Sequence, residues 1–338
     1  MSVKKKTPKA FRPINNRIYS RNRCFYCGNL LRNKNSREHV FPKWLQEEFN
    51  LWDQTIHLLN GTTIQYSKLT IPCCHSCNTV HLSKLENRVK RYLFNEPIRV
   101  ARQHSGDILI WAMKILLGII YAERLLPWQR SKPSGRRIFP SHMRDSLAMT
   151  HFFVQGLDLK IEFEAEGRPR IPGSVFIFNL KQYPDASTHF HFRDDLDTLS
   201  VFMRLGNRGI IATADGGAID FEIGPLVKRD GASKLHPIQF DEIGAKIFYK
   251  ASLFNRTPKY ITMHHNKTYR VMQMPLAGLS NKPVFDPWDH RMYARYLAAF
   301  MNVDVERISS PDGSLVSTWL YDKDNRRVNI PISDKKSC

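Results

Sequence analysis

The side chains best suited to chemistry gather in the first quarter of the sequence, where two cysteine pairs each have the C-x-x-C spacing. The pairs are Cys24 with Cys27 and Cys74 with Cys77. Zinc takes four ligands in a tetrahedron, and two such loops supply two thiolates each. The sequence therefore predicts a structural Zn²⁺ site. One alternative stays open, because Cys73 can take the place of Cys74 as a ligand.

A histidine beside an acidic residue lies between the two pairs. Glu38 and His39 fall within the segment that the zinc would close, and Asn78 directly follows the second pair. Histidine suits a general base at neutral pH, and oxygen donors suit Mg²⁺ or Mn²⁺. We expect His39 to act as a base and Glu38 and Asn78 to bind the ion. His81 is a further ligand or a phosphate contact, and Glu86 assists it or forms an ion pair on the helix surface.

Residues 24 to about 90 resemble the HNH, or ββα-metal, endonucleases of the treble-clef zinc type. The resemblance rests on C-x-x-C, then Glu-His-Val-Phe-Pro, then C-x-x-C-Asn, and covers about a fifth of the chain. It implies that His39 is the general base, that Glu38 and Asn78 bind the catalytic ion, and that the four cysteines hold a structural zinc. The implied reaction is hydrolysis of phosphodiester bonds in DNA.

The chain departs from the pattern of this family at two places. The middle asparagine of the family usually stands a few residues before the second cysteine pair, where this chain has Ser67, Lys68 and Leu69. The residue that orients His39 is therefore not assigned. Glu38 stands where aspartate is commoner, and its longer side chain would reach the ion through a water molecule.

The charge of the chain favours a polyanionic partner. Its 51 Lys and Arg residues against 31 Asp and Glu give a formal net charge of +20. Binding to phosphates releases counterions, so we expect DNA as the partner, with RNA as the alternative. The other reading of the charge is a basic surface kept for solubility. Residues 1–23 have no acidic side chain, so they form either a phosphate-binding arm or a solvated tail.

The cysteines and the apolar segments indicate a cytoplasmic protein with no membrane partner. Five of the six cysteines crowd into the first quarter, unlike those of a disulfide-stapled secreted protein. No apolar run follows the basic N-terminus as in a signal peptide. The longest apolar run, 108–120, contains Lys114 and is too short to span a bilayer. Cys338 is the last residue, so it does not belong to a C-a-a-X motif.

Periodic patterns predict the elements that position these side chains. A short helix should include Trp44, a strand should cover 62–71, and a helix should run from Asn78 to about Leu93. Residues 108–126 are apolar nearly all round, which predicts a buried helix. Beyond 150 the apolar side chains change to the two-residue period of strands, at 159–164, 174–180, 189–192, 199–205 and 210–213. Helices are expected after these at 240–254 and 289–301, and further strands within 309–332.

The predicted fold class is α+β, in four parts. These are a basic arm at 1–23, a zinc-stabilised ββα-metal (HNH) nuclease domain at 24–95, a helical connector at 96–150, and a mixed α+β domain at 151–338. The last part would serve target selection, ligand sensing or dimerisation, so a homodimer is one expected assembly.

Of four weaker motifs, three favour ordinary structural roles and the fourth, a basic loop, stays open. They are the pair His189 and His191, the dipeptide His264-His265, the turn Asp215-Gly216-Gly217-Ala218, and the basic loop Trp128–Arg137. Neither histidine pair is framed by cysteines or carboxylates, and the glycine turn lacks the lysine of a phosphate loop. The basic loop is equally a DNA contact or a solvated loop.

The leading hypothesis is a metal-dependent DNA endonuclease, and restriction or anti-phage defence is a context suggested by analogy alone. The alternative is a non-catalytic zinc protein that binds nucleic acid.

Overall fold

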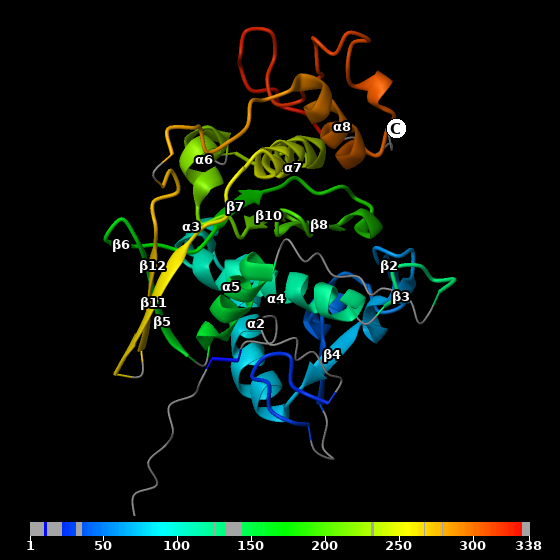
Figure 1. Ribbon diagram of the computed structural model, residues 1–338. Coiled ribbons are helices and arrows are strands. Elements are labelled where there is room, and N and C mark those ends of the chain that lie inside the picture. Colours follow the sequence, from blue (N-terminus) through cyan, green and yellow to red (C-terminus); the bar gives the residue numbers. More distant parts are fainter. Residues whose placement is uncertain are drawn as a thin grey trace, which may run out of the picture. The chain divides into compact units, whose positions relative to one another are not determined.

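The computed structural model describes residues 10–11, 22–31, 36–124, 126–132, 144–157, 159–230, 233–266, 268–278 and 280–332 (Figure 1). The predicted α+β class is confirmed, with eight α-helices and several sheets among these residues. The chain divides into two compact units, the first made of Met1–Asn95, Gly106–Pro172 and Lys259–Met274 and the second of Glu96–Ser105, Gly173–Pro258 and Pro275–Cys338.

Each unit is assembled from separate segments of the chain, which changes unit after Asn95, Ser105, Pro172, Pro258 and Met274. Most of the expected connector belongs to the first unit, because its helix α4 (Ser105–Arg124) is buried nearly all round and must lie inside a core. Lys259–Met274 joins the same unit because strand β12 (Thr268–Gln273) pairs in parallel with β5 (Lys160–Ala165). Pairing between such distant segments leaves no local pattern in the sequence.

Helix α4 is the one helix, among the described residues, that is long and apolar enough to cross a membrane. Most of its side chains are buried in the fold, including Lys114. This burial is typical of the core helix of a soluble protein.

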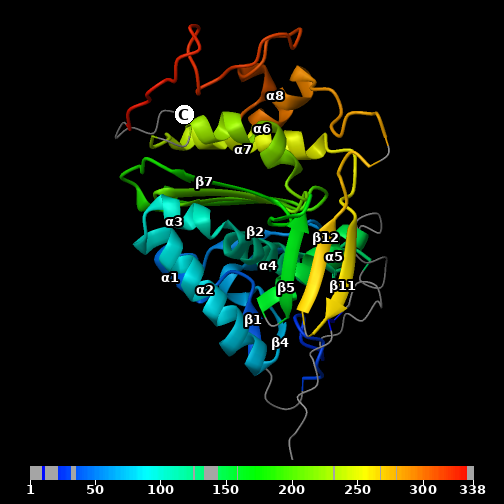
Figure 2. The same cartoon turned by 90° about the vertical axis from the view of Figure 1, so that its left-hand side faces the viewer.

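The first unit is built on short paired strands and on helices that pack against them. Strand β1 pairs antiparallel with β4, β2 pairs antiparallel with β3, and a four-stranded sheet has the order β11-β12-β5-β6. Figure 2 shows β5, β12 and β11 side by side. In addition to α4, β5 and β12, the elements are β1 (Ser36–His39), α1 (Lys43–Glu48), β2 (Thr55–His57), β3 (Thr63–Gln65), a 3-10 turn (Tyr66–Lys68), β4 (Thr70–Cys73), a π-helical segment (Cys77–Leu82), α2 (Ser83–Lys90), a second π-helical segment (Arg91–Asn95), α5 (Arg144–Val154), a 3-10 turn (Gln155–Leu157), β6 (Arg168–Pro169) and β11 (Tyr260–His265).

The segment 62–71, expected as one strand, is divided into β3, a 3-10 turn and β4. The turn buries Tyr66, whose ring meets that of Phe41 edge-on with 4.8 Å between centroids. Packing of this aromatic pair therefore interrupts a segment whose alternation favours a continuous strand. The break leaves β4 as the partner of β1, in the register that pairs Glu38 with Ile71 and His39 with Thr70.

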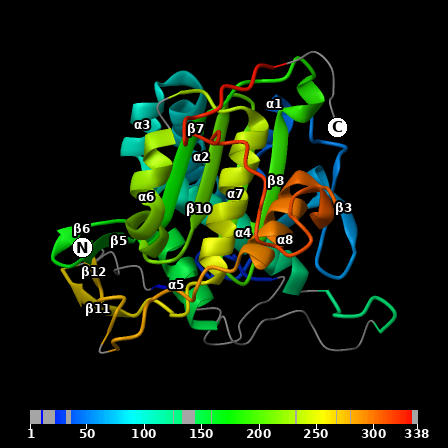
Figure 3. The same cartoon turned by 90° about the horizontal axis from the view of Figure 1, so that it is seen from above.

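The second unit is an antiparallel sheet in the order β7-β10-β9-β8. Helices α6 and α7 lie across one face of this sheet, and α8 packs against α7 (Figure 3). Its core of buried side chains lies between the sheet and these helices. The elements are α3 (Ile98–Gln103), β7 (Ser174–Asn179), a 3-10 turn (Ala186–Thr188), β8 (Phe190–Asp195), β9 (Ser200–Leu205), β10 (Arg208–Thr213), α6 (Ala218–Asp230), α7 (Pro237–Ser252), α8 (His290–Met301) and a 3-10 turn (Val305–Arg307).

One expectation for the C-terminal half is wrong, because the segment 309–332 forms only isolated bridges where we expected strands. The turn at Asp215 leads from β10 into α6. The Asp215 carboxylate accepts hydrogen bonds from the backbone N–H groups of Gly217 (3.0 Å) and Ile219 (2.7 Å) and from the Ser174 hydroxyl (2.8 Å). An acidic side chain thus occupies the N-terminal end of α6, where a phosphate loop would keep its amides for a ligand.

Candidate active site and metal centre

The first cysteine pair is shaped by a tight backbone turn. The Gly28 N–H donates to the Cys24 carbonyl at 2.9 Å, and Gly28 has a φ of 75°, in the left-handed region that glycine adopts without strain. The Phe25 N–H donates to the Pro72 carbonyl at 2.8 Å. Because Pro72 lies in β4, directly before the second pair, this bond brings the two cysteine loops together.

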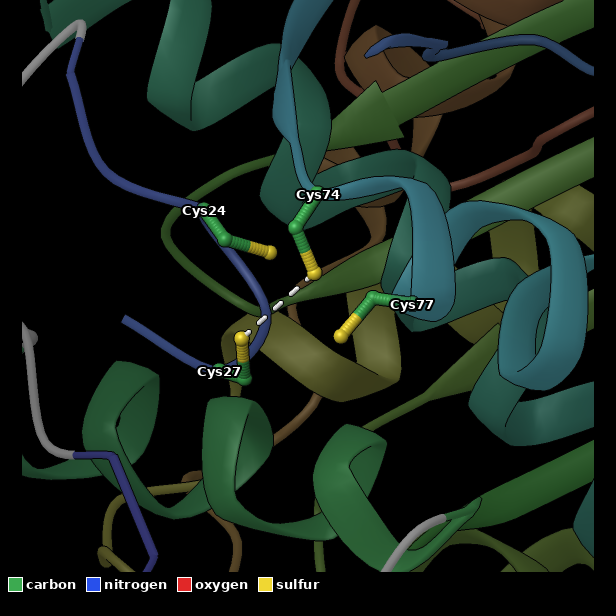
Figure 4. Close-up of side chains that lie close together, drawn as sticks. All are labelled: Cys24, Cys27, Cys74 and Cys77. Carbon is green, nitrogen blue, oxygen red and sulfur yellow. Dashed lines mark hydrogen bonds between the residues drawn. The ribbon is translucent and has the colours of Figure 1, made fainter. Parts of the chain in front are cut away.

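The four sulfurs of Cys24, Cys27, Cys74 and Cys77 lie within 4.8 Å of one another (Figure 4). The Cys27 and Cys74 sulfurs are 3.8 Å apart, which matches the roughly 3.8 Å between ligands of a tetrahedral zinc with Zn–S bonds of about 2.3 Å. Cys73 is buried with its sulfur 3.8 Å from that of Cys24, but it is not a member of the group. The cluster is therefore compatible with a structural metal such as zinc, with Cys74 as the ligand in place of Cys73.

Hydrogen bonds among the thiols separate their pKa values. Bonds from Cys27, Cys73 and Cys77 lower the pKa of Cys24. The bond to Cys24 raises the pKa of Cys27 to about 12, and the same cause, first of several, raises that of Cys77. A divalent cation, which requires deprotonated sulfurs, would take the place of the thiol protons.

Helix α5 supports the first cysteine loop from behind. Burial lowers the pKa of His151, so its ring is neutral, and Nε2 donates to the Phe25 carbonyl at 2.7 Å. Its Nδ1 accepts from Gln155 Nε2 at 3.0 Å, and the Tyr26 hydroxyl donates to the Gln155 carbonyl at 3.1 Å. The sequence analysis named neither His151 nor Gln155, which lie just beyond the expected helical connector at 96–150. The spacing of four residues between them, on one helix face, was the available signal.

Replacing Gly28 by alanine should destabilise the first unit by about 2 to 4 kcal/mol, from left-handed strain and overpacking. The new Cβ would lie 2.3 Å from the Phe11 ring. Phe11 cannot move easily, because its backbone N–H and carbonyl are both bonded to the Gln155 side chain, at 2.7 and 2.8 Å. Gly61→Ala is the matched control, since Gly61 has a φ of 74° and nothing within 4 Å of its Cβ position. Denaturant unfolding of the zinc-loaded protein should show the larger loss for Gly28→Ala, and equal losses would contradict the contact with Phe11.

His39 ends strand β1 and is half-buried. Its ring lies 5.9 Å from that of the exposed Trp52. Its Nδ1 is buried and has no hydrogen-bond partner among the described residues. Burial, followed by the charge of Lys43, lowers the pKa of His39, although Glu38 opposes them. The imidazole is therefore neutral at pH 7, as a general base must be.

Asn78 and His81 diverge within the π-helical segment. The Asn78 amide donates from Nδ2 to the Arg37 carbonyl at 3.2 Å, which holds it beside β1 two residues before His39. The His81 ring stacks on Tyr26, with 6.0 Å between centroids and 6° between planes. The π turn is wider than an α turn, which changes the angular spacing of these two residues around the helix axis.

Glu38 lies in a buried charge cluster that the sequence did not predict. Its carboxylate forms an ion pair with Lys114 of α4, and Glu86 Oε1 is 3.0 Å from the same Nζ. Burial lowers the pKa of Lys114, but the two carboxylates outweigh it and the net pKa is raised. Burial raises the pKa of Glu86 to about 7, against the opposing charge of Lys114. Lys114 is the one charged residue in the apolar run 108–120, and this was the sequence signal for the cluster.

Within the part of the chain that the structure describes, the four cysteines are the one group of three or more His, Cys, Asp or Glu side chains that could hold a metal ion. Glu38, His81 and the other paired histidines form no such group. The ring nitrogens of His189, His191 and His265 contact the Tyr183 carbonyl (2.7 Å), Arg193 Nε (3.1 Å) and Asn266 Nδ2 (2.8 Å), respectively, and the His264 ring packs on Tyr269. The predictions for the basic arm, for Arg136 and Arg137, and for Cys338 concern residues that lie mostly or wholly outside the described ranges.

The first unit thus holds a four-cysteine cluster compatible with a metal ion, and a neutral histidine that ends β1, with the Asn78 side chain bonded to the same strand. Comparisons of the chain with protein-family models, with curated proteins and with solved structures gave no match.

Proposed function

We propose that this protein is a metal-dependent endonuclease of the HNH type that hydrolyses phosphodiester bonds in DNA. The observation that carries the proposal is the setting of His39. It ends the first strand of an antiparallel β1–β4 pair, which leads through the second cysteine loop into the helical segment from Cys77 to Asn95. This β-β-helix order, with four clustered sulfurs beside it, is what the resemblance implies for a ββα-metal nuclease.

The side chains around His39 suit hydrolysis of a phosphodiester. The neutral imidazole takes a proton from the attacking water, which then adds to phosphorus as the sugar oxygen leaves. Arg37 and Lys43 are exposed on either side of His39 in the sequence and can contact the phosphates. Trp52, 44% exposed beside the His39 ring, offers a flat apolar surface to a sugar or base.

A Mg²⁺ or Mn²⁺ ion, when bound, would neutralise charge on the leaving oxygen. Asn78 suits it as a ligand, because its Nδ2 bond to Arg37 leaves Oδ1 for a cation. The carboxylate of Glu38 is already paired with Lys114, and the His81 ring is stacked on Tyr26. The ligand roles predicted for Glu38 and His81 therefore stay predictions, and Asn78 is the ligand that this geometry favours.

The second candidate is a non-catalytic zinc protein that binds nucleic acid. It is favoured by the pairing of Glu38 with Lys114 and by the lack, in the described residues, of a gathered carboxylate site for a catalytic ion. The net charge of +20 suits either candidate. The leading proposal places the protein in the cytoplasm, with a role in restriction or anti-phage defence. In the same proposal, the second unit selects targets, senses a ligand or forms a homodimer.

Cleavage and binding assays on the zinc-loaded protein separate the two candidates. We expect supercoiled plasmid to be nicked or linearised when Mg²⁺ or Mn²⁺ is added and to stay intact without it, with single-stranded RNA as a parallel substrate. Binding measured from 50 to 200 mM salt should weaken steeply in either case. A protein that binds both nucleic acids with this salt dependence and cuts neither with either ion is the non-catalytic binder.

A further inference from the structure

Lys114 is a fully buried lysine in the middle of an apolar helix. Its Nζ forms an ion pair with Glu38 and donates to Glu86 Oε1 at 3.0 Å and to the main-chain carbonyl of His39 at 2.9 Å, with the Val40 carbonyl at 3.3 Å. An ammonium group loses several kcal/mol of hydration free energy on burial, and an apolar residue would suit the same core at least as well. The lysine therefore calls for an explanation beyond stability.

The contacts of Lys114 converge on the peptide that carries His39. Two of its partners are the carbonyls of His39 and of Val40, where β1 ends. Helix α4 approaches this point closely, because Gly118 lies one turn beyond Lys114 and a Cβ there would be 3.0 Å from both Val40 methyl groups. The Val40 N–H donates to the Leu69 carbonyl at 3.0 Å, so the end of β1 is fixed from both sides.

No side chain in the part of the chain that the structure describes forms a hydrogen bond to Nδ1 of His39. The sequence also has no asparagine where the resemblance would place the orienting residue. The direction of the ring is therefore set by its backbone and by packing against Trp52. A shift of about 1 Å in a reacting group can cost about 100-fold in rate, so the backbone position matters.

We propose that Lys114 is the positioning residue for His39, and that Glu38 and Glu86 are its counter-ions. The inference rests on the proposed function of His39 as a general base. In this arrangement Glu38 acts through Lys114 and does not bind the catalytic ion. Lys114 itself is shielded from solvent, so it holds the His39 and Val40 carbonyls without touching the substrate.

The test compares two variants that differ only at Lys114. Lys114→Met alone would leave two buried carboxylates without a cation, so it is combined with Glu38→Gln and Glu86→Gln to make a neutral core. The matched control is the double variant Glu38→Gln, Glu86→Gln, which keeps the lysine and its bonds to the two carbonyls. For the triple variant we expect kcat to fall about 10- to 100-fold while KM and zinc content stay within twofold of the wild type. The kcat of the double variant should stay well above that of the triple variant, because the two differ only at Lys114.

Wild-type kcat in the triple variant would overturn the proposal, and so would a fall in kcat matched by the double variant. If the triple variant does not fold, the variant Gly118→Ala tests the proposal in its place. Its added methyl group would press on Val40 without changing any charge. Its kcat should fall several-fold while its zinc content stays that of the wild type, and a wild-type kcat would contradict the link. The role of Glu38 has its own readout in Glu38→Gln, for which we expect the Mg²⁺ concentration at half-maximal rate to stay within twofold; a tenfold rise would make Glu38 an ion ligand.

A failure of the proposed function is distinguishable from a failure of this inference. If wild-type protein cuts no nucleic acid, the proposed function fails, but the NMR signals of the His39 imidazole still report its position. Those signals should shift in the triple variant and stay in place in the double variant. Unchanged signals in both would overturn the positioning role by itself.

Discussion

His39→Ala is expected to reduce the rate of plasmid cleavage by about 100- to 10,000-fold, the usual contribution of a general base. The imidazole is the one neutral base at the end of β1, and its pKa is lowered by burial and by Lys43, so it is ready to accept a proton at pH 7. Zinc content and DNA affinity should stay close to those of the wild type, because no described hydrogen bond of the fold uses the His39 side chain. Initial rates with saturating Mg²⁺ measure the effect.

His57→Ala is the matched control, since His57 lies on β2 of the same unit and is exposed. It should cut at the wild-type rate. In the wild type, a plot of log kcat against pH should rise with slope one and level off below the usual histidine pKa of about 6.5. Cleavage by His39→Ala at the wild-type rate, or a plateau reached only well above pH 7, would remove His39 from the base role.

The cysteine centre is the part of the site that the sequence predicts best. Two C-x-x-C loops constrain each other, because a tetrahedral ion accepts only sulfurs that converge. The four residues expected from spacing are the four that the structure gathers. The choice between Cys73 and Cys74 needed the end of β4, because Cys73 is its last residue and is paired with Ser36, whereas Cys74 lies just beyond the strand.

The sequence could not predict which residues support the site, because these residues contact it from distant segments of the chain. Lys114 meets Glu38 across more than seventy residues, and His151 meets Phe25 across 126. Periodicity indicated helices at both places but not which strand or loop each helix would meet. The same limit explains why β12, paired with the distant β5, was not assigned to the first unit.

Cys74→Ser is expected to abolish zinc binding and to unfold much of the first unit. Structural zinc contributes about 10 to 16 kcal/mol of apparent binding free energy in small zinc domains, which is as large as the whole stability of a typical domain, about 5 to 15 kcal/mol. A serine hydroxyl cannot replace a thiolate ligand, so the ion should be lost on dialysis against a mild chelator. The cysteine loops are tied to β4 and α5 by single hydrogen bonds, which would not hold them alone. Metal content per chain and the circular dichroism melting curve measure both effects.

Cys73→Ser is the matched control for this prediction, because the two cysteines are neighbours and only Cys74 belongs to the group of four. Burying a hydroxyl at Cys73 should cost about 1 to 3 kcal/mol and leave one zinc bound per chain. The reverse result, with zinc kept by Cys74→Ser and lost by Cys73→Ser, would exchange the two residues and require a different register at the end of β4. Zinc kept by both single variants and lost when they are combined would mean that either sulfur can serve as the ligand, since the Cys73 sulfur is also 3.8 Å from that of Cys24.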